Sequence, residues 1–132
     1  MKRLSALVIF ALLASAPMLA SEPSAGATAV APDVVAGTYN IFYKWSEMTT
    51  YAEDPITLHR NHTGTDTYGD AITWSLSGKT ITIVFENSSF PGVTATYIGT
   101  KNRVGFSHQR NPGTMSNSSG DTGIWYGLTT AR

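Results

Sequence analysis

The chain contains no cysteine and few charged residues, and both shortages narrow the functions it can have. Its 132 residues include no cysteine, which excludes a disulfide scaffold, a cysteine-ligated zinc site, a haem attached through C-x-x-C-H and a thiol nucleophile. Charged residues make up 14% of the chain, against about 25% in an ordinary soluble domain, which excludes a coiled coil or a charged disordered tail. Nine basic residues balance nine acidic ones, and without a basic surface we expect no nucleic-acid partner.

The chain also lacks a hydrophobic run long enough to form a membrane-spanning helix. Its longest run, Leu4 to Ala16, has 13 residues, whereas a spanning helix needs about 20. Lys2 and Arg3 precede this run and small residues follow it, which predicts a signal peptide over residues 1–20. We therefore expect an exported protein, periplasmic or extracellular, and the absence of cysteine favours a bacterial source.

Residues 21–36 consist mostly of small residues with two prolines and show no periodicity. Such a segment is typical of a flexible leader. The folded domain is then expected over residues 37–132. Without the signal peptide, the loss of Lys2 and Arg3 leaves a net charge of −2.

Polar and apolar residues alternate through most of this domain, as in half-buried β-strands. No segment shows a helical period or an internal repeat. Ser77-Gly78 is typical of a tight hairpin turn, and residues 64–70 are either a loop or one more short strand. Longer loops are expected over residues 87–92, 111–113 and 117–123. The alternating runs cover residues 38–46, 56–59, 72–77, 80–85, 93–97, 104–108 and 124–128.

Seven or eight short strands predict an all-β domain, either a barrel or a sandwich. Every connection is short, which favours neighbouring strands that run up and down. A closed barrel also removes exposed strand edges, and few charges are present to protect an edge. We therefore expect a single antiparallel up-and-down barrel of about eight strands, with a sandwich as the alternative.

The face that the alternation turns inward is rich in aromatic residues. An eight-stranded barrel is either filled by its own side chains or holds one small ligand, and both interpretations stay open here. Buried tyrosines need hydrogen-bond partners, which a ligand or water at a barrel mouth can supply. The candidate ligand-binding residues are Tyr39, Tyr43, Trp45, Trp74, Phe85, Tyr97, Phe106 and Tyr126.

The pattern resembles the lipocalin-like, or calycin, barrels. Gly37-Thr38-Tyr39 is similar to the G-x-W that opens the first lipocalin strand, with tyrosine in place of tryptophan, and Arg132 follows the last predicted strand as the late lipocalin arginine does. No segment of residues 37–132 shows a pattern that predicts the C-terminal helix of that family. The resemblance implies a barrel that binds a small apolar ligand.

A weaker resemblance is to the avidins. Residues 94–99 are similar to a pocket strand of that family, and Trp125 to its late pocket tryptophan. The alternation, however, places Trp125 on the outer face and Tyr126 on the inner face. The acid that usually follows the tryptophan strand is also missing.

Motifs for enzyme chemistry are incomplete. Residues 77–80 imitate the end of a P-loop, but they lie before a predicted strand instead of a helix. His59 and His62 are expected on opposite faces, which disfavours a metal site. The acidic residues of the domain are ordinarily interpreted as solvated loop charges. They include Glu53, Asp54, Asp66 and Asp70. An enzyme is therefore the least favoured class, and no catalytic residue, metal ligand or cofactor is assigned.

The favoured function is non-covalent binding of a small apolar or aromatic ligand inside the barrel. The alternative is a filled barrel that acts on a protein partner or as an inhibitor through its loops. In that case residues 48–55, 88–91 and 112–123 are the candidate surfaces, and Phe90 at a loop tip is the clearest single clue.

Overall fold

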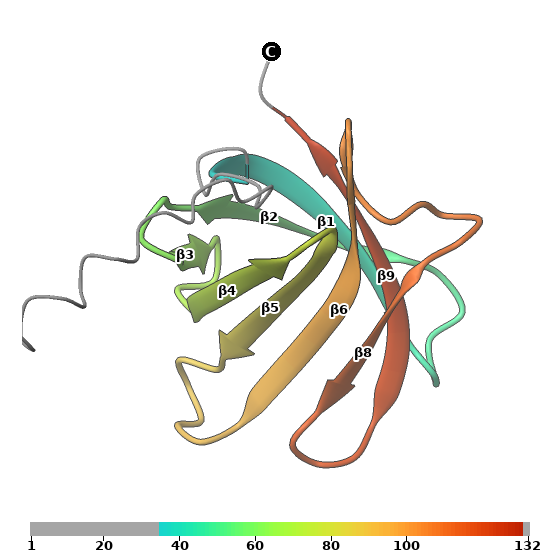
Figure 1. The fold of residues 1–132 in the computed structure, drawn as a ribbon. Helices are drawn as coiled ribbons and strands as arrows, with labels where there is room; N and C mark the ends of the chain where they lie inside the picture. Colours follow the sequence, from blue (N-terminus) through green and yellow to red (C-terminus); the bar gives the residue numbers. More distant parts are fainter. Residues whose placement is uncertain (1–34, 131–132) are drawn as a thin grey trace, which may run out of the picture.

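The computed structural model describes residues 35–130, and these form one closed β-sheet (Figure 1). The predicted signal peptide, nearly all of the predicted leader and Arg132 lie outside the described residues. Within the described part of the chain there is no helix. The strands are β1 Gly37–Trp45, β2 Ala52–Leu58, β3 Thr63–Asp66, β4 Ala71–Ser77, β5 Thr80–Glu86, β6 Thr94–Asn102, β7 Gly105–Phe106, β8 Gly113–Asn117 and β9 Thr122–Thr129.

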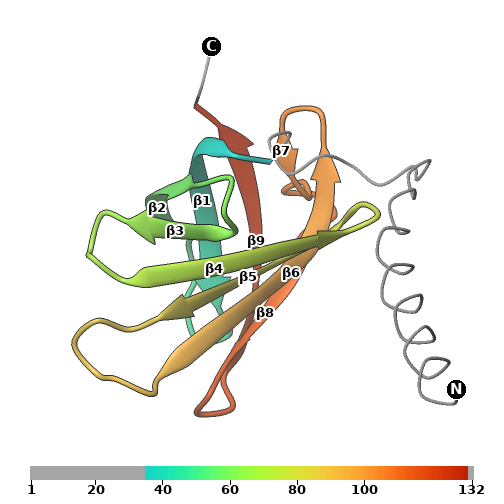
Figure 2. The same cartoon turned by 60° about the vertical axis from the view of Figure 1, so that its left-hand side comes forward.

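The sheet closes because its first and last strands pair. β1 and β9 are antiparallel from Tyr39↔Thr129 to Trp45↔Gly123, and every other neighbouring pair is also antiparallel. Both β7 and β8 lie between β6 and β9, at different heights (Figure 2). They act as one interrupted strand, so the nine strands occupy eight positions around the barrel. The predicted all-β, antiparallel, up-and-down barrel is confirmed.

The strand prediction missed β8, whose ends were expected to be loops. Its sequence, GTMSN, contains a single large apolar residue, Met115. A strand that turns one large apolar residue and one glycine inward gives almost no period-2 signal. The short strand allowed within residues 64–70 exists as part of β3, which begins at Thr63.

The two ends of the barrel are formed by different connections. Loops 46–51, 67–70, 87–93 and 118–121 meet at one end, which we call the mouth; loops 87–93 and 118–121 are the lowest parts of the barrel in Figure 1. Loops 59–62, 78–79 and 103–104 meet at the other, the closed end. The register shows the same order, since Glu86↔Thr94 pair at the mouth and Thr80↔Thr100 at the closed end.

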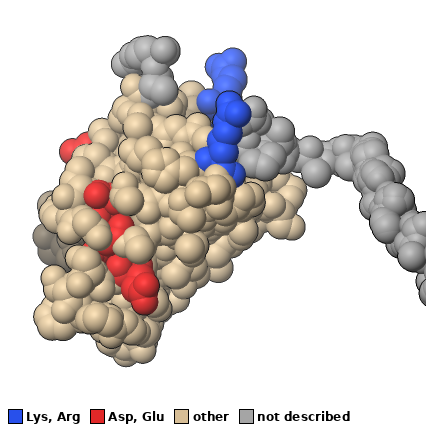
Figure 3. All heavy atoms as spheres, turned by 90° about the vertical axis from the view of Figure 1, so that its left-hand side faces the viewer, with Lys and Arg blue, Asp and Glu red and all other residues tan. Residues whose placement is uncertain are grey.

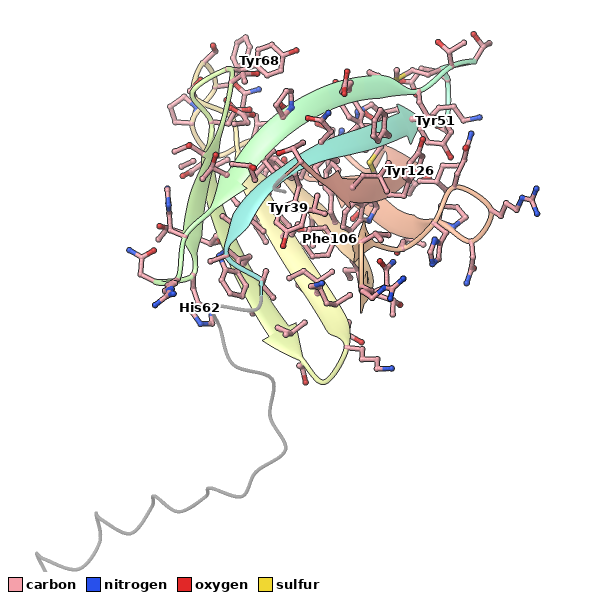
Figure 4. All side chains as sticks on the ribbon, turned by 90° about the horizontal axis from the view of Figure 1, so that it is seen from above. Tyr39, Tyr51, His62, Tyr68, Phe106 and Tyr126 are labelled. Atoms are coloured by element: carbon pink, nitrogen blue, oxygen red, sulfur yellow. The ribbon has the colours of Figure 1, made fainter. Side chains whose placement is uncertain are left out.

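A column of aromatic rings fills the barrel from the closed end toward the mouth. Tyr39 packs on Phe106 with ring centroids 4.5 Å apart, and Phe106 lies 5.9 Å from Trp125. Trp125 then meets Tyr97 edge-on at 5.4 Å. The hydroxyl of Tyr39 donates a hydrogen bond of 2.6 Å to the carbonyl of Val35, the first described residue. Tyr39 and Phe106 lie side by side within the ring of strands (Figure 4).

The two aromatic residues in the middle of β9 face opposite to the prediction. Trp125 is completely buried in the core, whereas Tyr126 lies on the outer face and stacks on Phe42 at 4.9 Å. The inward neighbours of Trp125 on its strand are glycines, Gly123 and Gly127. The pattern was misassigned because the outward residues of β9 are larger and more apolar than these glycines.

Glycines on the neighbouring strands make room for the indole of Trp125. A methyl group on Gly99 would approach the Trp125 ring to 2.8 Å, and one on Gly113 would approach its ring nitrogen to 2.6 Å. The indole N–H donates to the carbonyls of Ile98 at 3.1 Å and Thr114 at 3.0 Å. Trp125 therefore fills the barrel and satisfies backbone groups of β6 and β8 in one position.

Candidate functional site at the barrel mouth

The interior is packed at the closed end but hollow at the mouth. Two adjoining hollows, of about 190 and 220 Å³, share five lining residues. We call their combined space the mouth cup. Its shared lining is Trp45, Asp70, Phe85, Asn87 and Ala95.

The structure divides the predicted ligand-binding residues into three groups. Tyr43, Trp45, Phe85 and Tyr97 line the mouth cup. Tyr39, Trp74 and Phe106 are core residues with less than a tenth of their surface exposed. Tyr126 faces outward, toward Tyr51 and Phe42, so the prediction that it faces the interior is wrong (Figure 4).

Trp74 shows why a predicted pocket residue can instead be purely part of the core. Its indole N–H donates to the carbonyl of His59 at 3.0 Å. The ring of His62 stacks on it at 4.4 Å. Trp74 thus anchors the β2–β3 loop at the closed end, and neither its ring nor its N–H is directed to the cup.

The apolar wall of the cup continues the aromatic column of the core. Phe85 and Tyr97 lie 4.7 Å apart, and Tyr97 rests against Trp125. Burial raises the pKa of Tyr97 far above its ordinary value. Its phenol is therefore neutral at physiological pH and offers both a donor and an acceptor.

The polar wall of the cup is acidic, and the sequence interpretation missed it. Asp54, Asp66 and Asp70 all line the larger hollow. Asp54 is not a loop charge: it lies within β2 and is only 7% exposed. It occupies the same inward side of β2 as Ile56 and Leu58. The two-residue spacing of Asp54, Ile56 and Leu58 was a usable signal, but the sequence analysis interpreted Asp54 as a solvated loop charge.

Asp66 organises the β3–β4 loop around the cup. Its Oδ1 accepts hydrogen bonds from the backbone N–H groups of Tyr68 at 2.9 Å and Asp70 at 2.8 Å. Asp70 in turn accepts a 2.8 Å bond from the N–H of Ser88 in the β5–β6 loop. These carboxylates therefore connect two of the loops that form the mouth.

The surroundings of Asp54 oppose the ionisation of its carboxyl group. Burial raises its pKa to about 7, and the charge of Asp66, a hydrogen bond between the two carboxyl groups and the charge of Asp70 act in the same direction. A hydrogen bond with the backbone of Thr67 acts in the opposite direction. The Oδ1 atom of Asp54 is buried without a hydrogen-bond partner.

No lysine, arginine or histidine is among the described residues that line the cup. On the face drawn in Figure 3, most acidic atoms form a band below the basic atoms, which reach the top. Residues 35–130 contain no cluster of three or more His, Asp or Glu side chains able to hold a metal ion. They also contain no helix long and apolar enough to cross a membrane.

The rim of the mouth carries two exposed aromatic side chains. Tyr68 of the β3–β4 loop is 67% exposed, and Phe90 of the β5–β6 loop is 65% exposed. Asn87 holds the second loop in place, because its Oδ1 accepts the N–H groups of Ser89 and Phe90. An apolar ring is thus presented beside an acidic cup.

Comparison with known proteins assigns this chain to no family. No protein-family model, curated protein or solved structure matches the chain. The closed eight-position antiparallel barrel is compatible with the lipocalin-like architecture. Tyr39, the residue that the sequence analysis compared with the tryptophan of the lipocalin G-x-W, is buried at the closed end, where its ring packs against Phe106.

Proposed function

We propose that this chain is an exported, lipocalin-like barrel that binds a small molecule with an aromatic or apolar body in its mouth cup. One observation carries this proposal: the barrel is packed at one end and hollow at the other, and four of the inward aromatic residues line the hollow. A barrel whose interior served stability alone would gain nothing from leaving that space empty, since an unfilled void forfeits dispersion contacts.

The size of the larger hollow limits a ligand held there to about one ring system. An apolar cavity of about 150 Å³ holds benzene, and the larger hollow measures about 220 Å³. At roughly 0.3–0.6 kcal/mol per non-hydrogen atom, a ligand of about ten atoms gains about 3–6 kcal/mol. The expected dissociation constant therefore lies between about 6 mM and about 40 μM.

The lining is of the kind that small-molecule sites use. Such sites combine apolar and aromatic walls with a few fixed polar groups that orient the ligand. In the cup, Trp45 and Phe85 provide aromatic walls, and Asp70 and Asn87 provide polar groups that can orient the ligand. Burial of the ligand's apolar surface, at about 25 cal/mol per Å², supplies the driving force.

A variant that fills the cup tests this function directly. Ala95 is a small residue on the wall shared by both hollows, so Ala95→Phe is expected to abolish ligand-induced changes in tryptophan fluorescence. Thr73→Phe, on the exposed outer face of β4, is the matched control and should bind normally. Equal binding by both folded variants would show that the ligand does not occupy the cup.

A second candidate function, recognition of a protein partner through the mouth loops, rests on the exposure of Tyr68 and Phe90. Substitution of Phe90 by Ser separates the two candidates. It leaves the cup lining intact, so small-molecule binding should persist. A loss of binding to a purified protein partner, with ligand binding unchanged, would favour the loops over the cup.

A further inference from the structure

We propose that the cup selects a ligand that carries a protonated primary amine next to its aromatic body, and that the ammonium group is held by Asp54, with Asp66 and Asp70 adding negative charge to the same wall. This inference deepens the proposed function and rests on it. It names the chemical class of the ligand, an arylalkylammonium ion, and assigns the acidic wall as the part of the site that recognises it.

The first argument is the uncompensated charge of the cup. Three carboxyl groups from β2, the end of β3 and the β3–β4 loop line one hollow. No basic side chain among the described residues shares that lining. Charged groups in a partly dry site are usually paired, and an ammonium ion would neutralise the repulsion that these groups exert on one another.

The second argument is an orphaned acceptor. Within residues 35–130, Asp54 Oδ1 is the one buried side-chain nitrogen or oxygen without a hydrogen-bond partner. Buried polar atoms in native structures nearly always have a partner. Asp54 is 7% exposed and lines the larger hollow, so a donor bound there would lie beside the carboxyl group whose Oδ1 lacks a partner.

The nature of the lining favours an organic cation over a metal ion. The described acidic residues are not grouped so as to hold a metal. Tyr43, Trp45 and Phe85 line the same hollow and add aromatic rings to it. Aromatic faces attract organic cations, and a primary ammonium adds the N–H donors that a carboxylate needs.

The site also predicts the direction of the pH dependence. The groups that face Asp54 are Asp66, Asp70 and the phenols of Tyr43, Tyr68 and Tyr97, none of which is a cation. Because the pKa of Asp54 is raised to about 7, this group becomes ionised only as the pH passes neutrality. An amine with a pKa near 10 stays protonated throughout, so its affinity should rise from pH 5.5 to pH 8.

The experiment compares three probes of equal size on the purified protein by isothermal titration calorimetry at pH 8 and low salt. The probes are 2-phenylethylamine, its neutral analogue 2-phenylethanol and the anion phenylacetate. The amine should bind at least tenfold more tightly than the alcohol, and phenylacetate should not bind. Equal affinities for amine and alcohol would overturn the charge selection while leaving the proposed function standing. If no probe binds to folded protein, both proposals fail for ligands of this size.

Substitutions assign the effect to the acidic wall. Asp54→Asn should lower the affinity for the amine at least tenfold, leave that for the alcohol within threefold, and abolish most of the rise with pH. Glu53→Gln is the matched control, because Glu53 precedes Asp54 on β2 but is exposed on the outer face. Asp70→Asn provides a second variant if Asp54→Asn does not fold. An unchanged amine affinity in the folded acidic-wall variants would overturn the proposal.

Discussion

Both ends of this barrel turn tyrosines inward but use them in opposite ways. At the closed end, the hydroxyl of Tyr39 is bonded to Val35 and its ring is packed on Phe106. At the mouth, Tyr43 and Tyr97 line a hollow together with three carboxyl groups. An inward aromatic residue therefore indicates core or site only when its height along the barrel axis is known.

The largest expected difference between the ends is in stability. Phe106→Ala removes a fully buried ring from the aromatic column and should lower the free energy of unfolding by about 3–5 kcal/mol. Trp45→Ala removes a larger ring that borders a hollow and should cost only about 1–2 kcal/mol. Urea unfolding followed by circular dichroism measures both. Equal losses would mean that the mouth is packed as tightly as the closed end.

The next largest expected effect is the pH dependence of stability that Asp54 causes at the mouth. The raised pKa of Asp54 means that the folded state retains a proton between about pH 4 and pH 7 while the unfolded state has lost it. Stability from this group is therefore fully present below pH 4 and is lost as the pH rises to 7. Asp54→Asn should remove this slope and make the protein more stable at pH 8 by on the order of 2–4 kcal/mol.

Urea unfolding of the wild type and variant at pH 4, 6 and 8 tests that expectation, with Glu53→Gln as the control. If Asp54→Asn lowers stability at pH 8, the carboxylate contributes to the fold and is not a strained group of the site. Together with the ligand titrations, this measurement shows whether Asp54 lowers the free energy of unfolding at pH 8 while it raises the affinity for the ligand.

The smallest expected effect concerns the outer face. Tyr126→Ala removes the stacking on Phe42 and the edge contact with Tyr51 and should lower the free energy of unfolding by about 1 kcal/mol. Ligand affinity should not change, because Tyr126 is outside the cup. Loss of ligand binding in a folded Tyr126→Ala protein would reverse the assignment of inward and outward residues on β9.

The barrel could be predicted from sequence because strands such as β4 and β5 alternate cleanly between Thr or Ser and large apolar residues. The assignment failed on β9, where the inward positions beside Trp125 are glycines. These glycines give no apolar signal of their own, yet they create the space that the indole fills.

The site could be predicted only in part, for a different reason. Alternation identified the inward side of β1, which includes Tyr39 and Tyr43, but it contains no information on which of these residues lies at the hollow end. That depends on how the strands are staggered around the barrel, which follows from long-range pairing. Asp54 was missed because it was interpreted as a solvated loop charge, although it continues the inward alternation of Ile56 and Leu58 on β2.

The pairing of β1 with β9 also determines where the described chain enters and leaves the barrel. Val35 packs at the closed end under Tyr39, and the hydroxyls of Thr38 and Thr130 lie 2.6 Å apart. A short linker across this gap would give a circular permutant with new termini at a loop such as 78–79. By the same geometry, a surface tether attached beyond residue 130 would hold the barrel by its base, with the opening directed away from the support.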